Sequence, residues 1–173
     1  MQHLFLNTSS GHRIAYHTSS GEGVGVMFCP GYRSDMHSTK ATALAEWCAS
    51  HNVPLTRFDY RGHGKSDMAF KDFTIGGAME DALAVLDQAG VREMILIGSS
   101  MGAWVALNAA LERKGQVRGF IGVASAPDFT ERLMFARMSP EQRRELMEEG
   151  QIWAYSEMTD SDYPVTRHFI EEA

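Results

Sequence analysis

Short runs rich in apolar residues alternate with amphipathic stretches along the chain up to residue 123. The runs have little polar alternation, which is typical of strands buried on both faces of a sheet. They lie at 25–29, 53–58, 94–97 and 119–123. Apolar residues recur at helical spacing between the runs, at 41–48, 75–86 and 101–114. This alternation predicts an α/β fold, a doubly wound and mostly parallel sheet with helices on both faces.

The two ends of the chain follow other patterns. Residues 3–6 and 13–17 are predicted to be short strands joined by a polar turn, which indicates an antiparallel hairpin. From Thr130 onward we recognise only helical patterns and loops, so we divide the chain into a core, 1–129, and a helical cap segment, 130–173. One cap helix is expected to begin at the capping sequence Ser139-Pro140-Glu141-Gln142. The large apolar residues of the cap include Met134, Met138, Met147, Trp153, Tyr155 and Met158.

Composition narrows the class of protein. The 173 residues are 44% hydrophobic, which suits one globular unit with a real core, and the net charge of −6 argues against a nucleic-acid surface. No segment reaches the ~20 apolar residues of a membrane helix, and residues 1–20 do not resemble a signal peptide. Cys29 and Cys48 fall on predicted core positions, so we expect reduced thiols and a cytoplasmic location. We expect no cofactor and no metal.

The strongest motif is Gly98-Ser99-Ser100-Met101-Gly102, between a predicted buried strand and an Ala-rich predicted helix. A Gly-x-Ser-x-Gly sequence in this setting predicts a nucleophile elbow, in which Ser100 occupies a strained turn with its hydroxyl exposed. The flanking glycines remove side chains that would collide in that turn. The alternative is a turn of Gly and Ser without chemistry, but the strand and helix around the motif favour the nucleophile.

Two loops are candidates to complete a site around Ser100. Pro30-Gly31-Tyr32-Arg33-Ser34-Asp35-Met36 follows the third predicted strand, where a hydrolase of this kind carries one oxyanion donor. We assign the oxyanion hole to the backbone N–H groups of Tyr32 and Met101, with a plain connecting loop as the alternative. Asp59-Tyr60-Arg61-Gly62-His63-Gly64-Lys65-Ser66-Asp67 follows the fourth strand. His63 precedes the serine, against the order serine, acid, histidine of this fold, so we interpret it as a structural turn residue.

These three segments together resemble the α/β-hydrolase superfamily. The loop at 30–36, running into Thr39-Lys40-Ala41, is similar to that of a subgroup of small serine hydrolases. The subgroup includes bacterial enzymes and the mitochondrial acyl-protein thioesterase and acyl-glucuronide deacylase of animals. The resemblance implies hydrolysis of an acyl ester or thioester by a serine nucleophile. It also implies that the acid and the histidine follow two further strands, which residues 1–173 do not contain.

The catalytic acid and base are therefore open. Asp128, just past the last predicted strand, is our candidate for the acid, whereas Asp160 and Asp162 have no positional argument. His168 is the only histidine after Ser100, and its place in the cap makes it a poor candidate for the base. We expect this chain to be the N-terminal part of a longer hydrolase, inactive when isolated, with base and acid supplied by C-terminal sequence.

Other functions are considered as alternatives to a hydrolase. The chain could be an inactive fragment that needs a complementing chain, because an apolar sheet edge left uncovered invites pairing or self-association. The fold also hosts other activities, such as acyl transfer. The expected partner is a small acyl-ester or thioester substrate, without nucleic acid or a membrane span.

Overall fold

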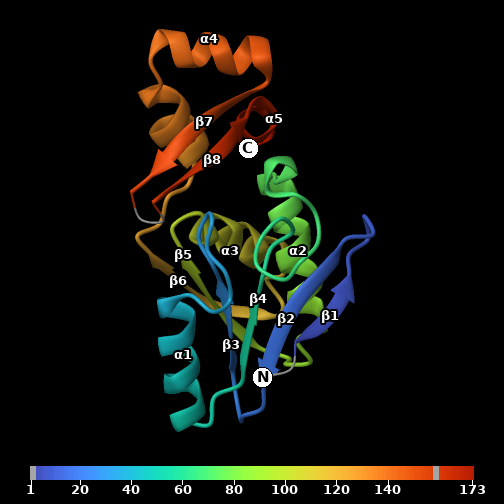
Figure 1. The fold of residues 1–173 in the computed structure, drawn as a ribbon. Helices are drawn as coiled ribbons and strands as arrows, with labels where there is room; N and C mark the ends of the chain where they lie inside the picture. Colours follow the sequence, from blue (N-terminus) through green and yellow to red (C-terminus); the bar gives the residue numbers. More distant parts are fainter. Residues whose placement is uncertain (1–2, 158–159) are drawn as a thin grey trace.

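A six-stranded sheet forms the centre of the computed structural model, which describes residues 3–157 and 160–173 (Figure 1). The strands stand in the order β1-β2-β4-β3-β5-β6, in which β3 is parallel to β4 and β5, and β5 is parallel to β6. β2 is antiparallel to both β1 and β4, so the hairpin predicted at the N-terminus is confirmed. The strands are β1 (Leu4–Asn7), β2 (Arg13–Ser19), β3 (Gly25–Cys29), β4 (Leu55–Phe58), β5 (Met94–Ser99) and β6 (Val117–Val123).

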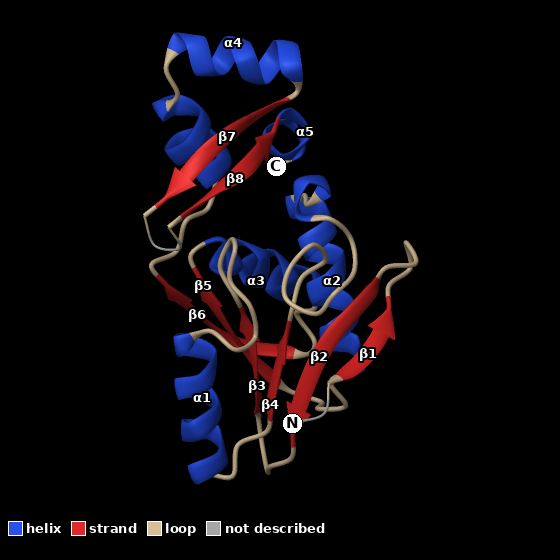
Figure 2. Ribbon diagram, in the orientation of Figure 1, coloured by secondary structure: helices blue, strands red, loops and turns tan. Residues whose placement is uncertain are grey.

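Helices cover both faces of the sheet, as the alternation of strands and helices predicted (Figure 2). α1 (Thr39–Ser50) packs Cys48 against Val26 and Leu55 on one face. α2 (Ile75–Gln88) and α3 (Met101–Glu112) cover the other face, where the larger core lies. Each buried strand thus contributes side chains to two apolar layers, which is why its sequence is apolar without alternation.

The ends of two helices follow local sequence signals. Thr74 accepts a hydrogen bond from the Gly77 N–H at the start of α2, and Gly90, with φ of 69°, follows its end. In α4 (Pro140–Glu149) the predicted capping box is confirmed, because Ser139 and Gln142 bond each other's backbone N–H.

The expectation of a purely helical cap is wrong. β7 (Gln151–Ser156) and β8 (Ser161–Thr166) form an antiparallel hairpin there, followed by α5 (Arg167–Glu172). In β7 the buried Ile152 is followed by the exposed Trp153, a period of two that marks a strand but extends over few residues. Pro164 hid the second strand in the sequence, because proline argues against a central strand. In the structure it is tolerated, because both strands of the two-stranded hairpin are edge strands. Met158, assigned to the cap by sequence, lies outside the described residues.

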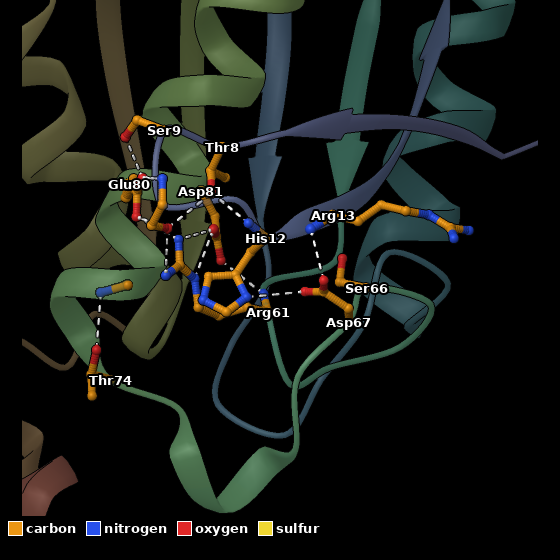
Figure 3. Close-up of polar contacts among 12 residues, drawn as sticks. Thr8, Ser9, His12, Arg13, Arg61, Ser66, Asp67, Thr74, Glu80 and Asp81 are labelled. Atoms are coloured by element: carbon orange, nitrogen blue, oxygen red, sulfur yellow. Dashed lines mark hydrogen bonds and ion pairs between the residues drawn. The ribbon is translucent and has the colours of Figure 1, made fainter.

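A buried ion pair ties the turn after β4 to α2 and to the N-terminal hairpin (Figure 3). Arg61 donates through its backbone N–H and its guanidinium to the fully buried Asp81, and its guanidinium also contacts Glu80. Ser9 and Ser10, from the turn between β1 and β2, bond the Glu80 carboxylate. Although partial burial raises the pKa of Glu80, these hydrogen bonds lower it to about 2. The cluster therefore fixes the hairpin on the core.

The edge strand β6 carries exposed apolar side chains, namely Phe120, Ile121 and Val123. Among the described residues no strand pairs with the outer edge of β6. Among residues 3–157 and 160–173, no helix has the length and apolar character needed to cross a bilayer.

Candidate active site

Ser100 stands at the turn between β5 and α3, where the sequence predicted the nucleophile. Its φ of 54° and ψ of −120° are a strained conformation for a residue with a side chain, as an elbow requires. A Cβ on Gly98 would lie 2.3 Å from the Gly102 carbonyl oxygen, and a Cβ on Gly102 would lie 2.1 Å from the Cys29 carbonyl oxygen. Both glycines are therefore required by close backbone contact, and they allow the half-buried serine to be held in this turn.

The loop after β3 lies beside Ser100 because the sheet register aligns the two strands. Cys29, at the end of β3, pairs with Gly98 of β5, so both loops leave the sheet at the same edge. A Cβ on Gly31 would approach the Ser100 Cβ to 3.5 Å. A cavity of about 180 Å³ opens here, lined by Gly31, Tyr32, Ser34, Lys40, Ser99 and Ser100.

Two backbone N–H groups, that of Tyr32 in the cavity wall and that of Met101 next in sequence to Ser100, are free to donate. Among the described residues, neither the Tyr32 N–H nor the Met101 N–H has a hydrogen-bond acceptor. Met101 is the first residue of α3, where N–H groups have no partner within the helix. Unpaired backbone donors near a serine are what an oxyanion hole needs.

His63 is buried under the loop rather than placed at Ser100. Its Nε2 accepts the Arg33 N–H at 3.1 Å, and its Nδ1 lies 3.2 Å from the Arg61 carbonyl oxygen. Phe73 packs against the ring at 4.7 Å between centroids. Burial lowers the pKa of His63 to about 4, so the ring is neutral at pH 7 and accepts one hydrogen bond while donating the other. This geometry agrees with the structural interpretation of His63.

The pKa of His63 predicts a loss of stability in mild acid. The unfolded chain has a histidine pKa near 6.5 and takes up the proton first as the pH falls, so the contribution is complete above pH 6.5 and lost toward pH 4. Between pH 7 and pH 5 we expect about 2 kcal/mol of lost unfolding free energy from this residue. His63→Gln keeps an acceptor but does not titrate. Urea unfolding at both pH values should show a smaller difference for the variant, and an equal difference would contradict this assignment.

Among the described residues, the Ser100 Oγ has no hydrogen-bond partner, so no base is bonded to it. His168 is an exposed residue of α5. Asp128 follows β6 with φ of 55°, and its exposed carboxylate is 3.9 Å from Arg132 rather than beside a histidine. Asp160 accepts a hydrogen bond from the Tyr155 hydroxyl. Burial raises the pKa of Cys29 to about 12, so that thiol does not compete as a nucleophile.

Two features of the site were not recognised from sequence. The buried Asp59 accepts the N–H groups of Met36 and Lys65, and so joins the loop after β3 to the turn after β4. Arg33 places its guanidinium 4.1 Å from the Tyr163 ring centroid, across the boundary between core and cap. The adjacency of Asp59 to a Gly-rich turn was a usable signal for the first. The second depends on a contact between residues far apart in sequence, which no local pattern reveals.

Comparison with known proteins places this geometry in a family. A family model described as "Serine aminopeptidase, S33" matches residues 24–164. The palmitoyl-protein thioesterase ABHD10, mitochondrial, of Homo sapiens is 38% identical over 98% of this chain and 55% of its own length. A crystallised protein of Agrobacterium vitis S4 is 37% identical with a TM-score of 0.92, over 98% of this chain and 70% of that one. Alpha/beta hydrolase domain-containing protein 10 from mouse is 33% identical with a TM-score of 0.87, over 99% of this chain and 69% of that one.

The alignments cover nearly all of this chain but only part of the relatives. The chain spans about half the length of the curated relatives that it matches. The nucleophile turn, the loop after β3 and the cap hairpin all lie within the span that aligns with the solved structures.

Proposed function

This chain belongs to the α/β-hydrolase family described as serine aminopeptidase, S33, and from that premise we propose that Ser100 is the nucleophile of an esterase or thioesterase. The observation that carries the proposal is Ser100 itself, held at a φ of 54° between a strand and a helix beside two unpaired N–H groups. A serine in that setting is arranged for acyl transfer, since charge that develops on the attacked carbonyl oxygen meets donors already in place.

The proposed reaction has two halves. The Ser100 Oγ attacks the substrate carbonyl, a histidine takes its proton, and the Tyr32 and Met101 N–H groups stabilise the oxyanion. The intermediate collapses to an acyl-enzyme, and the histidine gives its proton to the departing alcohol or thiol. Water then attacks the acyl-enzyme by the same route and releases the acid. We assign the histidine and its acid partner to sequence outside residues 1–173, with Asp128 kept as a candidate for the acid.

The division of the chain supports a substrate site between two parts. We propose residues 1–129 as the hydrolase core and 130–173 as a cap that covers the serine. Tyr163 and Phe169 of the cap contact the Tyr32 ring, at 6.1 and 5.0 Å between centroids. The aromatic rings that the cap turns toward Tyr32 suit an acyl chain, and the thioesterase named among the relatives favours a thioester.

A second candidate is that residues 1–173 are inactive without a complementing chain. The Ser100 Oγ without a base among the described residues favours it, and so does the exposed apolar edge of β6. Further strands or a second chain paired along β6 would cover that edge. Acyl transfer to an acceptor other than water would use the same serine and the same N–H groups. The palmitoyl-protein thioesterases among the relatives are named as mitochondrial, whereas a cytoplasmic location stays our prediction from the sequence.

A fluorophosphonate probe separates these readings. In the full-length protein we expect covalent labelling of Ser100 and hydrolysis of acyl thioesters, both lost in Ser100→Ala. In material confirmed by mass to be residues 1–173 alone, we expect no labelling, no measurable turnover and concentration-dependent association. Missing members of a triad leave only ~10³–10⁴-fold acceleration over water even in an intact site. Strong labelling of the isolated chain would contradict this expectation, and would return His168 or His63 to consideration as the base.

A further inference from the structure

The loop after β3 is held in a conformation that its own residues do not favour. Arg33 has a φ of 59°, in the left-handed region that costs a residue with a Cβ about 1 kcal/mol or more. The loop forms no helix or strand between β3 and α1. Within the loop the Ser34 N–H donates to the Gly31 carbonyl oxygen at 3.1 Å and closes a turn around Tyr32 and Arg33. Contacts from elsewhere in the fold add to this turn in holding the peptides around Arg33, including the Tyr32 N–H one residue earlier.

On the side of the core, the contacts are hydrogen bonds to buried acceptors. His63, which is 6% exposed, accepts the Arg33 N–H, and the fully buried Asp59 accepts the Met36 N–H at 2.7 Å. Both acceptors are fixed by further bonds, His63 at the Arg61 carbonyl and Asp59 at the Lys65 N–H. These bonds fix one side of the loop.

On the side of the cap, the contacts are made by side chains. The Arg33 guanidinium lies over the Tyr163 ring and donates to the Ser161 Oγ at 3.1 Å, and both partners belong to β8. The Tyr32 ring stacks on Phe169 of α5, with 5.0 Å between centroids and 5° between planes. α5 is itself attached to the core, because the Glu172 carboxylate accepts the Gly76 N–H at the start of α2.

We propose that Arg33 and Tyr163 are positioning residues for the oxyanion hole, so that the cap hairpin helps to set the direction of the Tyr32 N–H. The inference rests on the proposed function of Ser100 and Tyr32. Neither Arg33 nor Tyr163 is assigned a contact with the reacting atoms. Burial raises the pKa of the Tyr32 phenol well above its usual value, which leaves its ring a packing surface rather than an acid or base. The cap thereby serves the chemistry as well as enclosing the substrate.

The kinetic test uses the full-length protein and a matched pair of substitutions. Tyr163→Leu removes the ring beneath the guanidinium, and kcat should fall about tenfold with KM little changed, because a displaced donor weakens only the transition state. Tyr163→Phe keeps the ring and should restore most of kcat. Tyr155→Leu is the control, since Tyr155 is an exposed residue of the neighbouring β7 with no ring contact to the loop. Equal kcat values for Tyr163→Leu and Tyr155→Leu would overturn the proposal.

Two further measurements protect the test from a trivial result. Arg33→Met should lower kcat to a similar degree, and the double variant Arg33→Met with Tyr163→Leu should be no worse than either single one, because both break the same contact. Fully additive losses would contradict the proposed link. If Tyr163→Leu and Tyr163→Phe have the same unfolding midpoint, the change in kcat is not caused by a change in folding. If Tyr163→Leu does not fold, Arg33→Met is used in its place.

An NMR measurement separates failure of this inference from failure of the proposed function. The amide signals of Tyr32 and Arg33 should move in Tyr163→Leu and stay close to their original positions in Tyr163→Phe and Tyr155→Leu. Unchanged amide signals in Tyr163→Leu overturn the positioning role even if Ser100→Ala is inactive. Shifted signals together with an active Ser100→Ala would support the contact while removing the serine from the mechanism.

Discussion

Ser100→Ala in the full-length protein is expected to reduce ester and thioester turnover by several orders of magnitude. The members of a triad act as a unit, so loss of the nucleophile removes nearly all of its contribution. The fold should be retained, because the Oγ has no hydrogen-bond partner among the described residues and alanine only removes that atom. Steady-state kinetics with an acyl thioester, at protein concentrations checked by active-site labelling of the parent enzyme, measures the effect.

The matched control for this substitution is Ser38→Ala. Ser38 precedes α1 but makes no side-chain capping bond, so removal of its hydroxyl should change neither turnover nor stability. Turnover of Ser100→Ala within tenfold of the parent would remove Ser100 from the role of nucleophile. The unfolding midpoint of each variant shows whether any loss is chemical or structural.

Gly102→Ala is expected to destabilise the protein by about 3 kcal/mol or more. The added Cβ would lie 2.1 Å from the Cys29 carbonyl oxygen and 2.2 Å from the Pro30 carbonyl oxygen. Both are backbone atoms at the end of β3, so the helix or the strand has to move, and overpacking of this kind costs about 1–3 kcal/mol where smaller shifts suffice. That is a large part of the about 5–15 kcal/mol that holds a domain folded.

Gly115→Ala is the control for Gly102→Ala, because it makes the same chemical change where a Cβ would meet no atom within 4 Å. Its unfolding free energy should stay close to that of the parent. Urea unfolding of the two variants side by side measures the difference. Equal stability of Gly102→Ala and the parent would mean that α3 does not approach the end of β3 closely enough for a Cβ to collide.

The sequence alone was sufficient for the core of the fold. Buried parallel strands are recognisable because both of their faces are covered, which makes the whole strand apolar, as in Gly25–Cys29. The elbow could be predicted from its motif, since a Cβ on Gly98 would collide with the Gly102 carbonyl oxygen four residues away, whereas the contact that requires Gly102 is with the distant Cys29 and Pro30. Features that are marked by a local sequence pattern can be predicted from the sequence alone.

The cap shows where that reasoning ended. β7 and β8 are six residues each and face solvent on one side, so their alternation is short and is interrupted by Pro164. A helical capping box nearby, at Ser139, was correctly recognised because its partners lie three residues apart. Hairpin pairing in the cap depends instead on residues separated by a turn and on packing against the rest of the cap, which local propensity does not encode.

The sequence by itself indicated that Ser100 lies in a turn between a strand and a helix, that the core is parallel and that a loop with Tyr32 follows β3, because each is marked by a local motif or by burial of a whole strand. Only the tertiary structure decided that His63 holds the Arg33 N–H and that Arg33 reaches the ring of Tyr163. Those contacts join residues 30 or more positions apart, and their energies depend on distance and direction in space. The sequence specifies which side chains are available, and tertiary packing decides which of them come into contact.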